Sequence, residues 1–347
     1  MIVTLALVLA SAQQPPAALA IYRQAVESYQ STRRLDDARR LVGEWTRRQF
    51  EEAVAAEVRS SDRHRLEAAA VLHLEIALGV SLANPDGALL HIGLGEQLLR
   101  ARPAPPAAAA PDDGRDAFTG RWYAVAASGF VAQTDTLRAR PIIERGLTRA
   151  PDSAALRLVS GIVEEMDATR LEPDVTPGRA GVQVAMRRNA RAGMEGLARL
   201  ALAEREYRRA LEDDPDLAHA WLRLGRVLHQ RGQTATARDA LDRARQLGRR
   251  PADQLLVRLF LGDLEAADDV DAARRWFEAA WAGAPGVQSA WLALAQLEER
   301  EGHADRARRI TREGLTGPRL AADPWWDYRN GGLDVEGLAW LRARVQH

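Results

Sequence analysis

The chain has 347 residues, with 48 basic and 48 acidic side chains and a formal net charge of zero at pH 7. Nucleic acids and anionic membrane surfaces attract proteins with a strong basic excess, so this composition predicts neither kind of partner. The chain contains no Cys and no Lys. Their absence excludes disulfides, Cys-bound metals, Lys-dependent phosphate loops and Schiff-base chemistry.

The first residues have the order of a secretory signal. An apolar run from Ile2 to Ala10 ends in the small-residue pattern Ala10-Ser11-Ala12, which is typical of a cleaved export signal. We therefore expect residues 1–12 to be removed, the mature chain to begin at Gln13, and the protein to be periplasmic or secreted. A buried first helix or a misplaced start codon, with a cytoplasmic protein, is the alternative. No other segment reaches the ~20 apolar residues of a membrane span.

Residues 13–102 are predicted to form irregular helical repeats, because apolar residues recur there at helical spacing. His73 and His91 lie on these apolar patterns, which favours a core position over a metal site. Residues 103–116 are rich in Pro and Ala. Pro lacks the amide donor that a helix interior needs, so this stretch is predicted to be a linker.

Residues 117–321 contain a pattern that returns at almost constant intervals. Four alanines in equivalent positions are separated by 34, 36 and 34 residues: Ala203, Ala237, Ala273 and Ala307. A repeat of this length indicates a solenoid of helix pairs. Small residues at these positions allow two helices to cross closely, while larger ones such as Trp221 are expected to fill the space between them. No alternating apolar pattern predicts a strand, so the fold class is all-α.

The repeated residues resemble those of the tetratricopeptide repeat family. Trp221-x-x-Leu224-Gly225-x-x-Leu228 is followed by the small and apolar positions of a second helix, and the same second-helix pattern ends in Pro215 and Pro285 in neighbouring repeats. Arg258 and Thr311 depart from the pattern, because the family prefers apolar or small residues there. The resemblance implies a right-handed solenoid of antiparallel helix pairs.

The resemblance also implies a function, which is to bind a partner protein or peptide in the concave groove. In this family the first helix of each pair lines that groove. The corresponding positions in this chain are His219, Leu222, Arg226, His229, Arg258, Glu265, Gln296, Glu299 and Arg300.

Two segments interrupt or follow the repeats. An insertion at about residues 167–196 contains Pro and Gly and is predicted to be partly loop and partly helix. Residues 322–347 hold three aromatic residues, Trp325, Trp326 and Tyr328, and are predicted to cap the last helix pair. The alternative is a glycan-binding protein or hydrolytic enzyme that uses the insertion and this aromatic cluster.

No sequence motif points to catalysis or to a cofactor. His219 and His229 share one predicted helix at a separation of about 15 Å, which is too far to hold one metal ion. The acidic pair Glu164-Glu165 and the acidic residues around Glu298 are interpreted as solvated helix faces. The sequence therefore predicts a non-catalytic interaction scaffold without metal or cofactor.

Overall fold

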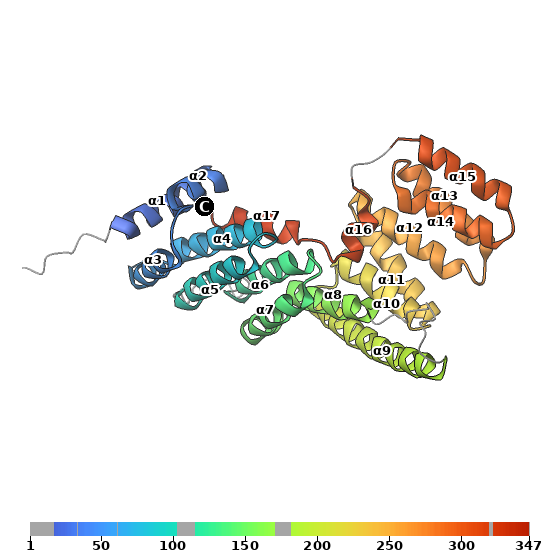
Figure 1. Ribbon diagram of the computed structural model, residues 1–347, viewed down its shortest axis with the longest axis horizontal. Coiled ribbons are helices and arrows are strands. Elements are labelled where there is room, and N and C mark those ends of the chain that lie inside the picture. Colours follow the sequence, from blue (N-terminus) through green and yellow to red (C-terminus); the bar gives the residue numbers. More distant parts are fainter. Residues whose placement is uncertain are drawn as a thin grey trace, which may run out of the picture. The chain divides into compact units, whose positions relative to one another are not determined.

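The computed structural model describes residues 17–32, 34–60, 62–102, 115–170, 182–318 and 322–346 (Figure 1). These residues form helices and connecting turns without a strand, which confirms the predicted all-α class. The helices are α1 (Ala17–Thr32), α2 (Leu35–Val42), α3 (Arg47–Ser60), α4 (Arg63–Val80), α5 (Pro85–Ala101), α6 (Arg115–Val131), α7 (Thr136–Arg149), α8 (Ala154–Arg170), α9 (Val182–Asp213), α10 (Ala218–Gln230), α11 (Thr234–Leu247), α12 (Pro251–Glu265), α13 (Val270–Gly283), α14 (Gln288–Arg300), α15 (Ala304–Thr316), α16 (Pro324–Arg329) and α17 (Val335–Arg344).

The chain divides into two compact units. The first comprises Met1–Ala109 together with Ala339–His347, and the second comprises Ala110–Leu338. The boundary lies within the linker predicted at 103–116, of which residues 103–114 are outside the described residues. The predicted signal at 1–12 is outside them as well. No helix in the described part is long and apolar enough to cross a bilayer.

The core of the first unit contains the buried imidazoles of His73 and His91. The Tyr22 hydroxyl lies 3.0 Å from Nε2 of His73, and Nδ1 of His73 lies 2.8 Å from Nδ1 of His91. Burial lowers the pKa of His73 well below its ordinary value and that of His91 to about 4, so both rings are neutral at pH 7. The expectation that these two His residues belong to the core is confirmed.

The final residues of the chain belong to this first unit. Arg342 donates two hydrogen bonds to the carboxylate of Glu75, at 2.6 and 2.7 Å. The same carboxylate accepts a hydrogen bond from the Tyr29 hydroxyl. Glu75 is almost fully buried, and a buried carboxylate is stable only when its oxygens are paired in this way.

The second unit is a row of helix pairs: α6/α7, α8/α9, α10/α11, α12/α13 and α14/α15. Each first helix contacts the next first helix, from α6 through α8, α10 and α12 to α14, so these five form one layer. The second helices contact their own partner and the following first helix. This is the arrangement that the repeat predicts.

Small residues hold the pairs together as expected. Ala203, Ala237 and Ala273 are completely buried. A methyl group added at Gly161 would overlap the ring of Tyr207 on the paired helix, and one added at Gly225 would lie 2.6 Å from a Leu241 side-chain carbon. The helices cross so closely that no side chain fits at these glycine positions.

The second half of the insertion at 167–196 is helical, as predicted, and belongs to α9, one helix of 32 residues from Val182 to Asp213. Residues 171–181 lie outside the described residues. Trp221 differs from the prediction, because its side chain is only half-buried. Its Nε1 donates a hydrogen bond to the Pro215 carbonyl at 2.8 Å, at the start of α10, so the indole packs on the preceding turn and does not fill the space between the helices.

Candidate functional site

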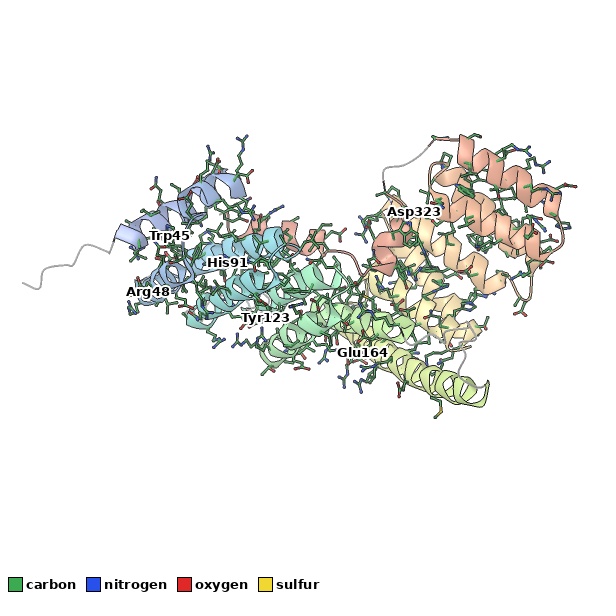
Figure 2. The ribbon with its side chains drawn as sticks, in the orientation of Figure 1. Trp45, Arg48, His91, Tyr123, Glu164 and Asp323 are labelled. Carbon is green, nitrogen blue, oxygen red and sulfur yellow. The ribbon has the colours of Figure 1, made fainter. Side chains whose placement is uncertain are left out.

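The candidate site forms where the C-terminal segment returns to the layer of first helices. Asp323 precedes α16 and accepts hydrogen bonds from the Ser289 amide at 2.8 Å and the Ser289 hydroxyl at 2.9 Å. It also accepts one from the Trp325 amide at 3.0 Å, which caps α16. The carboxylate of Asp323, a residue labelled in Figure 2, therefore joins the beginning of α16 to the beginning of α14.

A buried carboxylate on α8 fixes the other end of α16. Oε1 of Glu165 accepts a hydrogen bond from the Tyr328 hydroxyl at 2.6 Å. Oε2 accepts one from the Tyr207 hydroxyl at 2.6 Å and one from the Arg223 guanidinium at 3.0 Å. Burial and the negative charge of Glu165 raise the pKa of both tyrosines well above the ordinary value, so they stay protonated as donors.

Arg223 completes this buried cluster. Its side chain is 1% exposed, yet every nitrogen has a partner. Besides Glu165, it donates to the Tyr328 carbonyl at 2.8 Å and to Nε2 of His219 at 3.1 Å, and its guanidinium lies 4.1 Å from the centre of the Tyr328 ring. Burial, with Arg223 nearby, lowers the pKa of His219 well below its ordinary value, so this imidazole is a neutral acceptor.

The segment after α16 continues along the same helix layer. Gly331 has φ of +82°, and an added Cβ would lie 3.0 Å from Ile162 on α8. The Asp334 amide donates to the Ser128 hydroxyl on α6 at 3.0 Å. Residues 323–334 therefore pack on the first helices. The sequence predicted that this segment caps the free face of the last pair. It does not, because its polar partners lie on α6, α8, α10 and α14.

A hollow of about 320 Å³ remains beside α16, which we call the inner hollow. Its walls come from α12, α14 and α16, and its apolar surface includes both tryptophans of the aromatic cluster. The full lining is Leu259, Asp263, Gln288, Ser289, Leu292, Ala293, Gln296, Asp323, Trp325, Trp326 and Arg329. The inner hollow therefore unites one predicted groove residue, Gln296, with the C-terminal segment.

The aromatic cluster is only partly exposed. Tyr328 is buried, and Trp325 stacks on it with ring centres 5.9 Å apart. Both rings also contact the edge or face of Phe260 on α12. Trp326 is 51% exposed. The three rings do not form one open platform, so the cluster presents a single accessible indole at the inner hollow.

Two predicted groove residues of α10 lie beside this cluster. Arg226 forms an ion pair with Asp263 at 3.0 Å and stacks over the rings of Phe260 and Trp325. His229 is half-buried, and its Nδ1 is enclosed without a hydrogen-bond partner. Burial, with Arg226 nearby, lowers the pKa of this imidazole. Arg226 thus orients an acidic wall residue of the inner hollow.

The remaining predicted groove residues have other positions. Leu222 is buried, and His219 is half-buried within the Arg223 cluster. Glu265 pairs with Arg238 on α11. Arg258 lies against the end of α13, where a Cβ on Gly283 would be 2.7 Å from its guanidinium. These four side chains support the packing of the helices.

Arg300 and Glu299 also lie away from the inner hollow. Arg300 donates to the carbonyl of Ala266, which follows α12. Glu299 lines a different hollow at the end of the solenoid, described below. Of the nine predicted groove residues, Gln296 alone belongs to the lining of the inner hollow.

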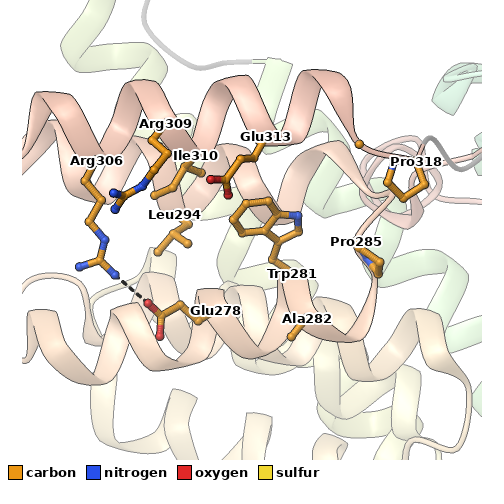
Figure 3. A pocket seen from close by; sticks show the side chains of 11 residues that line it. Glu278, Trp281, Ala282, Pro285, Leu294, Arg306, Arg309, Ile310, Glu313 and Pro318 are labelled. Carbon is orange, nitrogen blue, oxygen red and sulfur yellow. Dashed lines mark hydrogen bonds and ion pairs between the residues drawn. The ribbon is translucent and has the colours of Figure 1, made fainter.

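A second hollow, of about 400 Å³, lies between α13 and α15 (Figure 3). Trp281, Leu294 and Ile310 supply its apolar part, and an ion pair between Glu278 and Arg306 at 2.8 Å crosses one end. This hollow belongs to the second helices of the pairs. It contains none of the residues that the sequence singled out as groove positions.

Sequence reasoning missed the most enclosed charges of the unit. Glu164 and Glu165 were expected on a solvated face, but they are 8% and 6% exposed, and Glu298 is completely buried. Arg223 carried no signal in the sequence beyond its position between Leu222 and Leu224, both in the core. Among the described residues no group of three or more acidic or His side chains is arranged to hold a metal ion.

One comparison with known proteins matches part of the chain. Residues 196–253 match the model of a tetratricopeptide repeat family. This segment of the chain therefore contains tetratricopeptide repeats. A comparison with curated proteins finds no match.

Several solved structures match this chain at low sequence identity. Pseudomonas aeruginosa PilF is 19% identical over 66% of this chain and 90% of its own, with a TM-score of 0.45. TTC0263, a thermophilic TPR protein of Thermus thermophilus, is 19% identical over 67% and 97%, with a TM-score of 0.39. A tetratricopeptide repeat protein from Parabacteroides merdae is 15% identical over 79% and 99%, with a TM-score of 0.44.

Proposed function

We propose that this protein is a non-catalytic scaffold that binds a segment of a partner protein in the inner hollow. The supporting observation is that α12, α14 and α16 together enclose a hollow of about 320 Å³, in which the indole of Trp326 is exposed. Concave, mainly apolar surfaces with a few polar groups are the usual binding sites of proteins. The buried Glu165 cluster holds α16 in place, so this surface exists before a partner arrives, which lowers the entropy cost of binding.

The charges around the inner hollow define the partner's chemistry. Asp263 is paired with Arg226, and the oxygens of Asp323 accept hydrogen bonds from Ser289 and the α16 backbone. Arg329 is exposed, close to Trp326, and makes no ion pair with any described residue. We therefore expect a segment with a bulky apolar side chain next to a carboxylate, the apolar group against Trp326 and the carboxylate on Arg329.

Peptide selection tests this proposal directly. The full-length protein is immobilised and used to select peptides from a random display library. We expect enrichment of apolar residues adjacent to Asp or Glu. Trp326→Ala should weaken binding of the selected peptides at least ~10-fold, which is about 1.4 kcal/mol. Arg329→Glu should replace the acidic preference by a basic one.

The matched control is Arg243→Glu, an equally drastic charge reversal on α11, where Arg243 pairs with the exposed Asp216 and with no other described residue. It should leave the selected peptides unchanged. Peptides whose binding is insensitive to both Trp326→Ala and Arg329→Glu would show that the inner hollow is not the binding site.

The alternative of a glycan-binding protein or hydrolytic enzyme lacks the surface that it needs. It required Trp325, Trp326 and Tyr328 as an open platform, and Tyr328 is buried. The loop half of the insertion, residues 171–181, lies outside the described residues. No observation in the described part favours this function over the scaffold.

We also propose that the protein is exported. The proposal rests on the apolar run from Ile2 to Ala10 and the pattern Ala10-Ser11-Ala12. N-terminal sequencing of natively expressed protein should give Gln13 as the first residue. Recovery of an intact Met1 from the cytoplasm would reject export.

A further inference from the structure

The described residues leave one side of the last helix pair uncovered. The hollow on this side measures about 550 Å³ and is lined by residues of α14 and α15 only. We call this surface the end face. Its apolar residues include Leu292, which is 37% exposed, Leu315, which is 54% exposed, and Ala295.

An uncovered apolar end is unusual for a helical solenoid. Each pair buries its faces against its neighbours, and terminal pairs need a polar or covered outer side. The C-terminal segment was expected to supply the cover, but residues 323–334 pack on α6, α8, α10 and α14. The end face therefore keeps its apolar residues accessible in the described structure.

Opposite charges border the two sides of the end face. Glu299 lies on the α14 side, and Arg308 and Arg312 lie on the α15 side. Neither Glu299 nor Arg312 has an ion-pair partner among the described residues, and Arg308 pairs only with Asp305, which is 98% exposed. Such an exposed pair contributes little to stability and is easily exchanged.

We propose that a second copy of this chain covers the end face, forming a two-fold symmetric dimer. The two helices are antiparallel, so a two-fold axis parallel to them places α14 of one copy over α15 of the other. The apolar side of Leu292 then meets that of Leu315, and the acidic border of each copy meets the basic border of its partner. A two-fold interface must be self-complementary in this sense.

The size of the surface sets the strength of the dimer. Two helices of 13 residues present a face about 20 Å long and about 20 Å wide, because each residue adds about 1.5 Å and each helix is about 10 Å across. This face of about 400 Å² per copy, or about 800 Å² in total, is smaller than the interfaces of stable dimers and has the size of weak, transient ones. We therefore expect a reversible dimer with a dissociation constant of roughly 1–100 μM.

The test uses sedimentation of the full chain between about 1 and 300 μM, a range chosen to span that constant, with two charge reversals. Glu299→Arg and Arg308→Glu should each weaken dimerisation of the separate variants at least ~10-fold, because each homodimer contains two repulsive contacts. An equimolar mixture should dimerise like the wild type, because both contacts are then attractive. Glu212→Arg, an exposed reversal on α9, is the control and should leave dimerisation unchanged.

The mixture distinguishes a lost interface from a lost fold, because misfolded variants do not recover on mixing. A wild type that stays monomeric at the highest concentration would overturn the proposal, as would a dimer that is unaffected by both reversals. A mixture that stays monomeric would also overturn it. In these cases another protein, or none, covers the end face.

Discussion

Replacing Glu165 by Gln should destabilise the second unit more than any other Glu→Gln or Asp→Asn substitution in it. The carboxylate is the charged partner of Arg223, whose side chain is 1% exposed. The amide introduced by Glu165→Gln could still accept a tyrosine hydroxyl bond, but the guanidinium would lose its counter-charge. Removing one partner of a buried ion pair costs about 3–5 kcal/mol. We expect a loss in this range.

The neighbouring residue provides the matched control. Glu164 lies on the same helix and pairs with Arg140 at 2.6 Å and Arg199 at 2.7 Å, but these arginines are 29% and 38% exposed. Water can solvate them once the charge is removed, so Glu164→Gln should cost only about 1 kcal/mol. Urea unfolding of the full chain, followed by helical circular dichroism, measures both changes.

Hydrogen exchange locates the effect. In Glu165→Gln the amides of residues 322–334 should lose protection first, because Tyr328 and its carbonyl depend on the same cluster. The double variant Glu165→Gln with Arg223→Met should recover part of the loss, since it removes the unpaired buried charge while the introduced amide oxygen can still accept a tyrosine hydroxyl. A loss below about 1 kcal/mol for Glu165→Gln, the value expected of an exposed pair, or no recovery in the double variant, would refute the reasoning.

Two further outcomes follow from the packing and the titrating groups. Gly262→Ala should destabilise the second unit by about 1–3 kcal/mol in urea unfolding, because the added methyl overlaps the Phe277 ring; Gly193→Ala, which meets open space on α9, should instead stabilise by about 0.5–1 kcal/mol. Burial, with Arg39 nearby, lowers the pKa of His91 to about 4. In the unfolded chain the pKa of this imidazole is about 6.5. Between about pH 6.5 and about pH 4 the unfolded state therefore binds more protons than the folded state, and the free energy of unfolding should fall by about 3 kcal/mol over this range. An NMR titration that gives His91 an ordinary, unshifted pKa would contradict this.

The repeat architecture was accessible from the sequence because it depends on local spacing. The small residues at Ala203, Ala237 and Ala273 recur at nearly constant intervals, and each contact joins helices that are neighbours in the chain. Hydrophobic periodicity and small residues carry this information directly. Pairing, helix class and the closely crossing positions were therefore predictable.

The site was not predictable for the opposite reason. Tyr328 meets Glu165 across 163 residues, and Arg342 meets Glu75 across 267. A single charged residue that is buried by a distant segment has the same local pattern as a solvated one, which is why Glu165 and its neighbour were interpreted as surface residues. The prediction for Trp221 was wrong for a different reason. Its Nε1 donates a hydrogen bond to the preceding turn, so the indole is not buried between the helices although it occupies the expected position of the motif.

The inner hollow and the end face share a wall, which couples the two proposals. Leu292 and Gln296 line both hollows. A partner segment that fixes these side chains in the inner hollow changes the surface that a second copy meets.

Coupling between two binding events is reciprocal, so the factor by which a selected peptide changes the dimer dissociation constant must equal the factor by which dimerisation changes the peptide's affinity. Comparing wild type with the monomeric Glu299→Arg variant measures the second factor, and sedimentation with saturating peptide measures the first. If both factors equal one, peptide binding and dimerisation do not affect each other. The shared side chains would then adopt the same positions in both complexes, and the two surfaces would act independently.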